Sequence, residues 1–294
     1  MLNSVLIFYI KCILLIKIGV KMNTEYETIF KFITDSSRFC YAYSEVSKIP
    51  ELKYLFIKNF RNINAIEILL TNEEHNCFYQ EAATILRSFI ESSINFIYLL
   101  FFEQKRLVYQ EDSQLLVFKN NFMWHKKALN HPEELINELG ATVKQFEAEL
   151  VKSFNKLSNN NKTKILNGIK QKSFTVDKDV CSELDKFLKN YKSQFMNIRK
   201  MCEELSAADI TVNGLNFKDI INETYNEYSQ ITHTIFPIEK KEITERVFDI
   251  IRNCFTMNNA IVAVLHRKYN LMLPENLGIQ LKACSEVLEK HIRI

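Results

Sequence analysis

The sequence predicts an all-α protein, a multi-helix bundle around a long buried central helix that spans about residues 75–102. Glycine and proline number only 5 and 4 in 294 residues, whereas a protein of many short strands needs more turn residues. Apolar residues recur at intervals of three and four along most of the chain, which is the period of a helix. With 47% hydrophobic and 25% charged residues, the composition is that of an ordinary globular protein.

The chain begins with an apolar extension, residues 1–21. Lys11 and Lys17 divide it into runs too short to span a bilayer, and it lacks the charged start and small-residue cleavage site of a signal peptide. Because Met22 opens a stretch with residues suited to cap a helix, we favour a native start there. An amphipathic anchor lying in a membrane interface is the alternative.

Helical spacing predicts a first helix over residues 25–47 and a second over 51–70, with Pro50 between them. The sequence TNEE at 71–74 resembles a capping box. We therefore expect this box to start the central helix.

The central helix is apolar around most of its circumference over residues 82–102, yet it carries Arg87 and Glu91. Charges inside a membrane-spanning segment cost roughly 2.5–3.5 kcal/mol each on insertion scales. We therefore expect a core helix and no stable membrane span.

Arg87, Glu91 and Asn95 recur every four residues, so they share one face of this helix.

This polar line has several interpretations. An Arg that precedes Glu is the less favourable order for an exposed pair, so a surface salt bridge is a poor reason for it. If the pair is buried, removing one partner costs about 3–5 kcal/mol. The simplest interpretation is then a structural ion pair that fixes helix register, and the alternatives are ligand binding and catalysis.

Beyond the central helix, the pattern predicts helices over 108–130 and 147–157, with a short one between Pro132 and Gly140. The asparagine-rich sequence SNNNKTK at 158–164 breaks the pattern. We expect an exposed loop there.

The C-terminal part carries amphipathic patterns over four stretches: 187–205, 217–235, 238–269 and 275–290. We see no repeat period, which argues against a solenoid. We expect residues 22–294 to form a single helical domain. The lysine-rich stretch 140–190 either packs at its edge or forms a peripheral subdomain.

Charge and cysteine content restrict the function classes. The net charge is +3, so no strong global field for nucleic acid or membrane is implied. The 7 cysteines are scattered and form no C-x-x-C, which predicts reduced thiols in a cytoplasmic protein.

There is no zinc motif and no glycine-rich phosphate loop, so we predict no metal and no cofactor. We expect His75, His125 and His131 to be exposed and Trp124 to be a partly buried anchor.

A second polar line is formed by Tyr225, Ser229 and His233, which are also spaced by four residues. An ionised Glu91 that accepts a hydrogen bond from one of them would satisfy groups that burial penalises. We therefore expect the two lines to meet in a buried polar pocket.

These motifs resemble a bacterial family of uncharacterised helical proteins, known as a domain of unknown function. R-x-x-x-E lies in the segment 82–99 and Y-x-x-x-S-x-x-x-H in the segment 220–236, while 198–210 is more loosely similar. The resemblance covers roughly residues 50–265. It implies a candidate site carried over by position and no established activity: Arg87, Glu91, Tyr225, Ser229 and His233.

A more distant similarity, in helical architecture and polar pairs, is to HEPN-type proteins, some of which are RNases of toxin or antiphage systems. Their catalytic signature, an Arg followed a few residues later by His, is absent from this chain. That absence argues against a nuclease.

The function we expect is an interaction or sensor role in a bacterial defence or stress system, with a protein or RNA as partner and with oligomerisation open. The alternative is an RNA-cleaving enzyme. In that enzyme His233 would act as general acid or base and Ser229 as nucleophile or orienting group, while Arg87 would bind a phosphate or carboxylate.

Overall fold

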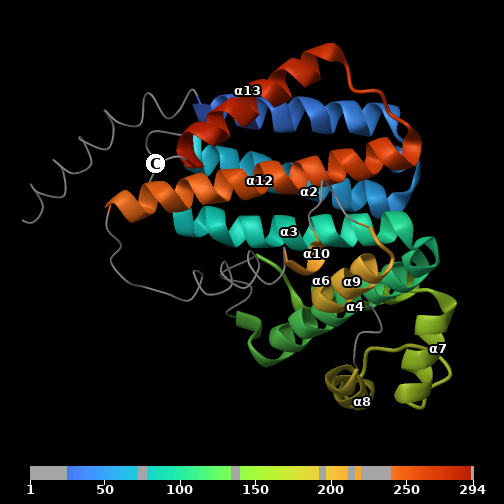
Figure 1. The fold of residues 1–294 in the computed structure, drawn as a ribbon. Coiled ribbons are helices and arrows are strands. Elements are labelled where there is room, and N and C mark those ends of the chain that lie inside the picture. The colour runs from blue at the N-terminus through green and yellow to red at the C-terminus, as the bar shows by residue number, and fades with distance from the viewer. Residues whose placement is uncertain are drawn as a thin grey trace, which may run out of the picture. The chain divides into compact units, whose positions relative to one another are not determined.

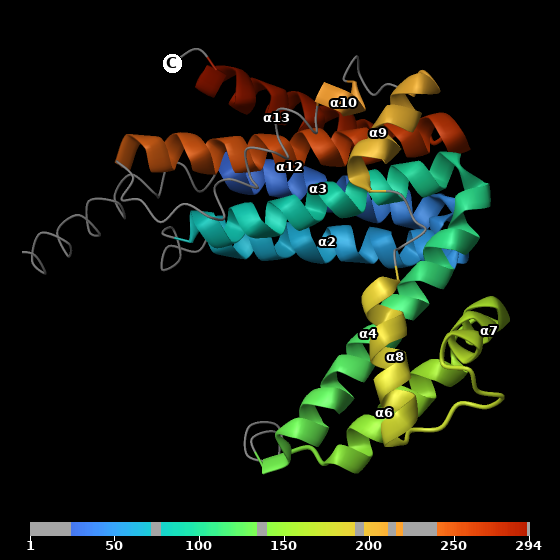
Figure 2. The same ribbon diagram turned by 90° about the horizontal axis from the view of Figure 1, so that it is seen from below.

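A computed structural model of the chain describes residues 25–71, 78–133, 140–191, 197–210, 216–219 and 240–292. The regular structure of these residues is helical, with no strand among them, which confirms the all-α prediction (Figures 1 and 2). The chain folds into two compact units. One comprises Met1–Phe101 with Asn197–Ile294, and the other comprises Phe102–Met196.

The first unit begins with a helix over residues 25–43, a short 3-10 helix, η1 (Glu45–Lys48), and the long helix α2 (Pro50–Thr71). Both N-terminal helices agree with the helical spacing of the sequence. Pro50 is the first residue of α2, where its missing N–H costs nothing. The apolar extension 1–21 lies outside the described residues.

The prediction that Thr71 caps the central helix is wrong. Thr71 is the last residue of α2, and its Oγ1 donates to the carbonyl of Glu67 at 2.7 Å. A threonine hydroxyl competes for nearby backbone carbonyls, and here it is satisfied by the helix that precedes it. Residues 72–77 lie outside the described part of the chain.

The central helix is α3 (Tyr79–Phe101), somewhat shorter than the predicted 75–102. Of its 23 residues, 14 are buried, because it packs against both α2 and α12 (Lys240–Tyr269) (Figure 1). Within the described residues only α3 has the length and hydropathy of a membrane span. Since 61% of its most apolar window is buried inside the protein, that match is weak support for a membrane.

The C-terminal helices complete the first unit: α9 (Ile198–Ala207), the single turn α10 (Phe217–Asp219), α12 and α13 (Glu275–Ile292). A buried polar contact ties α12 to the N-terminal helix. Ser37 Oγ donates to Asn258 Oδ1 at 3.0 Å, and Asn258 Nδ2 donates to Ser36 Oγ at 3.0 Å. These satisfied bonds fix the register of the two helices.

The second unit consists of η3 (Glu103–Lys105), α4 (Arg106–Asn130), α6 (Val143–Asn155), α7 (Asn159–Gly168) and α8 (Lys178–Asn190). Helix α6 packs against α4 (Figure 2). All four α-helices contribute to one hydrophobic cluster, which extends in sequence from Leu115 to Leu188. The stretch 140–190 thus belongs to this unit together with α4.

The predicted loop at 158–164 is wrong, because α7 occupies most of it. Ser158 is the N-cap of α7 and accepts from the backbone N–H of Asn161 at 3.2 Å. Asn161 is itself buried, and its Nδ2 donates to the backbone carbonyl of Glu111 on α4 at 2.8 Å. Contacts to another helix therefore stabilise a segment whose composition favours a loop.

Two side chains of α4 test further predictions. Trp124 is 45% exposed and stacks on Phe146 of α6 at 6.2 Å, as expected of a partly buried anchor. His125 was predicted to be exposed, but it is only 2% exposed. It follows Phe118 and Phe122 at helical spacing, so it shares the face of α4 that forms the core. Of the other two histidines, His131 is exposed and His75 lies outside the described residues.

Candidate functional site

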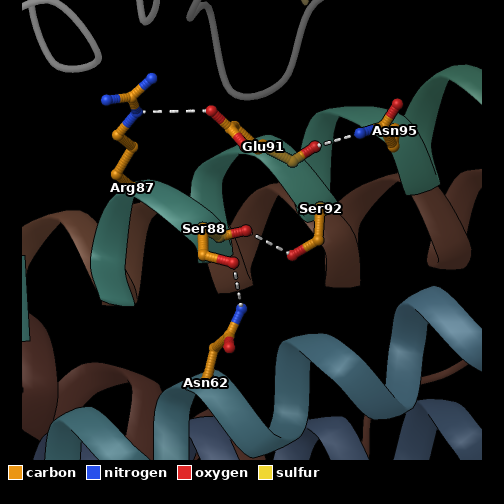
Figure 3. A network of polar contacts seen from close by, with 6 residues as sticks. All are labelled: Asn62, Arg87, Ser88, Glu91, Ser92 and Asn95. Carbon is orange, nitrogen blue, oxygen red and sulfur yellow. Dashed lines mark hydrogen bonds and ion pairs between the residues drawn. The ribbon is translucent and has the colours of Figure 1, made fainter. Parts of the chain in front are cut away.

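The polar line on α3 exists as the spacing predicts (Figure 3). Arg87 Nε donates to Glu91 Oε1 at 3.4 Å, and Asn95 Nδ2 donates to the backbone carbonyl of Glu91 at 2.8 Å. The three side chains lie along one face of the helix.

The Arg87–Glu91 pair is only partly buried. The side chains of Arg87 and Glu91 are 33% and 35% exposed. They occupy the narrow part of the helix circumference that its packing partners leave accessible, while the residues on the other faces are buried. A half-exposed i,i+4 pair contributes about 0.3–0.5 kcal/mol. The Arg87–Glu91 contact by itself is therefore a weak contribution to stability.

Ser88 and Ser92 lie beside the polar line but point toward α2 (Figure 3). Asn62 Nδ2 donates to Ser88 Oγ at 3.5 Å. Ser92 Oγ donates to the Ser88 carbonyl at 2.8 Å and also lies against the side-chain amide of Asn59. These contacts join two packed helices, so we regard them as structural and separate from the accessible line.

The polar line leads to a buried residue that sequence analysis missed. Tyr98 follows Asn95 by three residues, so it belongs to the same side of α3. Its ring is buried, and its hydroxyl donates to Glu204 Oε2 on α9 at 2.5 Å. Burial raises the pKa of the Tyr98 phenol, and the hydrogen bond to Glu204 raises it further. The helical spacing was a usable signal for Tyr98, whereas nothing local identifies Glu204.

The second predicted line, Tyr225, Ser229 and His233, lies outside the described residues. Its approach to Arg87 and Glu91 stays a prediction.

The described part of the chain supports neither a metal site nor a nucleophilic cysteine. No group of three or more His, Cys, Asp or Glu side chains could hold a metal ion there. Five cysteines are free in this part, and burial raises the pKa of each thiol: Cys40, Cys181, Cys202, Cys254 and Cys284. Since the thiolate is the nucleophile, the raised pKa values give no support to a nucleophilic role for these cysteines.

The fold and the polar line together define an all-helical protein with an accessible ionic pair on its central helix. More particularly, the chain belongs to the family of unknown function DUF5677, whose model matches residues 52–237. This confirms the resemblance to a domain of unknown function, and the match includes both motifs that carried it. No curated protein and no solved structure matched the chain.

Proposed function

We propose that the protein is a binding protein, an interaction or sensor component, that recognises an anionic group through Arg87. The observation that carries this proposal is that the Arg87 side chain is one-third exposed on a helix that is otherwise largely buried. The Arg87–Glu91 contact by itself contributes little to folding, and a role in binding would account for two charges at this place.

The geometry suits anion recognition. The contact from Arg87 Nε to Glu91 orients the planar guanidinium, which is the group best shaped to bind a carboxylate or phosphate with two hydrogen bonds. The hydrogen bond from Asn95 to the Glu91 carbonyl and the Tyr98–Glu204 contact limit the movement of neighbouring side chains. Such fixed surroundings lower the entropy cost of binding.

A thermal-shift screen with phosphate- and carboxylate-bearing small molecules tests this proposal. We expect at least one compound to raise the Tm of the native protein and to have no effect on Arg87→Ala. The matched control is Arg252→Ala, which breaks the similarly exposed pair of Arg252 with Asp249 on α12. A compound that stabilises Arg87→Ala as well as it stabilises the native chain would contradict the proposal.

A second candidate function is RNA cleavage by His233 together with Arg87. The observation in its favour is that one family model spans both residues. If it is correct, purified protein degrades RNA, and His233→Ala abolishes the activity while circular dichroism shows an intact fold. Equal loss of fold in Arg87→Ala and His233→Ala would instead favour a purely structural network.

The setting we propose is the cytoplasm of a bacterial cell, in a defence or stress response. The free, mostly buried cysteines support a reducing compartment. Expression of the intact gene product with a fluorescent fusion, followed by cell fractionation, tests the location.

A further inference from the structure

The second unit contains a basic stretch without acidic residues, from Val151 to Val176. This stretch includes the end of α6, all of α7 and most of the connection to α8. It has no Asp or Glu and six lysines: Lys152, Lys156, Lys162, Lys164, Lys170 and Lys172. Within the described part of the chain only Lys152 of these six forms an ion pair, with Glu149 at 2.9 Å. Most of the positive charge of the stretch is therefore not held in ion pairs.

Packing brings the two ends of this stretch into one region. Phe174 stacks on Phe154 of α6, with ring centroids 4.2 Å apart and an interplanar angle of 11°. Lys152 and Lys156 lie two residues to either side of Phe154, and Lys172 lies two residues before Phe174. All three lysines are exposed. The fold thus concentrates positive charge near the end of α6.

A groove of about 740 Å³ lies on the exposed face of α6 in this region. The described residues that line it all belong to α6, and they include three lysines: Lys144, Lys152 and Lys156. Glu147 is the one carboxylate among these lining residues, and Asn155 adds a side-chain amide. The groove therefore presents an excess of positive charge in a hollow that can receive a ligand.

We propose that this groove binds the phosphate backbone of a nucleic-acid duplex, independently of Arg87 in the first unit. From Lys144 to Lys156 the helix rises by about 18 Å. Each strand of a duplex carries one negative charge for about every 3.4 Å of its axis, so the row of lysines can face about five phosphates. Charge complementarity of this kind supplies most of the affinity of non-specific nucleic-acid binding.

The residue types of the groove indicate that binding depends little on base sequence. The stretch contains no arginine, the side chain that reads guanine with two hydrogen bonds. Lysine meets phosphate as a point charge, and contacts to phosphate position a protein on a duplex without reading its sequence.

Other anionic partners match this surface less well. A helix that lies on a membrane needs large apolar side chains beside its lysines, but from 144 to 176 only Val151, at 36%, is a large exposed hydrophobic residue. Single strands are bound through exposed aromatic rings, and the same residues have none. An acidic protein is a poorer match because lysine is depleted at the centres of protein interfaces.

Fluorescence anisotropy of the full chain with labelled RNA and DNA duplexes of about 20 base pairs, at about 50 mM salt, tests the proposal. We expect the native chain to bind, and the triple variant Lys144→Gln, Lys152→Gln, Lys156→Gln to bind at least tenfold more weakly. The matched control removes the same charge from three exposed lysines of the first unit: Lys48→Gln, Lys53→Gln and Lys282→Gln. This control should bind like the native chain. Comparing the two duplexes shows whether RNA or DNA supplies the phosphates.

Two further measurements distinguish a binding groove from a merely structural one. The slope of log affinity against log salt should be shallower by about three in the triple variant, because three phosphate contacts are lost. Glu147→Gln removes the carboxylate from the groove, so we expect it to bind either duplex at least twofold more tightly. This gain tests the site even if the triple variant fails to fold.

The competing partners are included as probes. Vesicles that contain phosphatidylserine test the membrane, and the separated strands of each duplex test single-stranded nucleic acid. A chain that binds the vesicles and neither duplex overturns the proposal, as does a control variant that loses as much affinity as the triple variant. Tighter binding of a single strand than of both duplexes overturns the assignment to a duplex.

Discussion

His125 is a buried titratable side chain in the core of the second unit, close enough to Glu147 to sense its charge. Burial lowers the pKa of His125, because it penalises the charged imidazolium, and Glu147 offsets only part of this effect. The Nδ1 atom is buried without a hydrogen-bond partner. The folded protein thus binds this proton less readily than the unfolded chain does.

The pKa shift of His125 predicts a pH-dependent stability. Above the unfolded pKa of about 6.5 the imidazole is neutral in both states. As the pH falls below that value the unfolded chain takes up the proton first, so the free energy of unfolding decreases. We expect a lower urea midpoint at pH 5.5 than at pH 7.5, and a smaller difference in His125→Gln. His131→Gln, at an exposed position, should behave like the native chain.

The hydroxyl of Tyr98 offers a second prediction at the residue scale. Tyr98→Phe removes the hydrogen bond to Glu204 without changing the packing of the ring. Because hydrogen bonds to charged groups contribute roughly 1.5–3 kcal/mol, we expect the free energy of unfolding to fall by about 1–2 kcal/mol, given that Glu204 is partly accessible.

Urea unfolding in a double-mutant cycle with Glu204→Gln measures that interaction. Tyr191→Phe, which removes the analogous bond to Asp112 in the second unit, provides a comparison of similar chemistry. Additive effects of Tyr98→Phe and Glu204→Gln would show that the contact contributes nothing.

Helix α7 shows how an element can contradict its own composition. Five of its ten residues are asparagine or glycine near an end, and these favour loops when considered alone. The stabilising contacts come from Glu111 on α4, which is far away in the sequence. Its carboxylate accepts from Ser158 Oγ at 3.0 Å, and its backbone carbonyl accepts from Asn161 Nδ2. A contact across 47 residues therefore decides the conformation.

The cap of α7 makes this account testable. Ser158→Ala removes both the N-cap acceptor and the bond to Glu111, so we expect a loss of about 1–2 kcal/mol in the free energy of unfolding. Thr163→Ala, at an exposed position of the same helix, should change stability by less than about 0.5 kcal/mol. Chemical denaturation followed by circular dichroism compares them, and equal effects would contradict a role for the cap.

On the scale of the whole molecule, the second unit is a continuous segment with its own hydrophobic cluster. That cluster is contained within residues 102–196. We therefore predict that the isolated segment 102–196 folds, giving a helical circular-dichroism spectrum and a cooperative thermal transition. A spectrum of disordered chain from this segment would show that its core is insufficient alone. The first unit, which is assembled from two distant parts of the sequence, is expected to need both of them.

The sequence by itself determined the helical class, the positions of α2, α3, α4, α12 and α13, and the shared face of Arg87, Glu91 and Asn95. Each of these depends on the 3.6-residue period, which is a relation between near neighbours in the chain. It did not determine that the ionic pair is half exposed, that His125 is buried, or that Glu204 joins Tyr98. Only the tertiary structure decided these, because burial and long-range hydrogen bonds depend on which helix covers a given face, and that choice is made by residues far away in sequence.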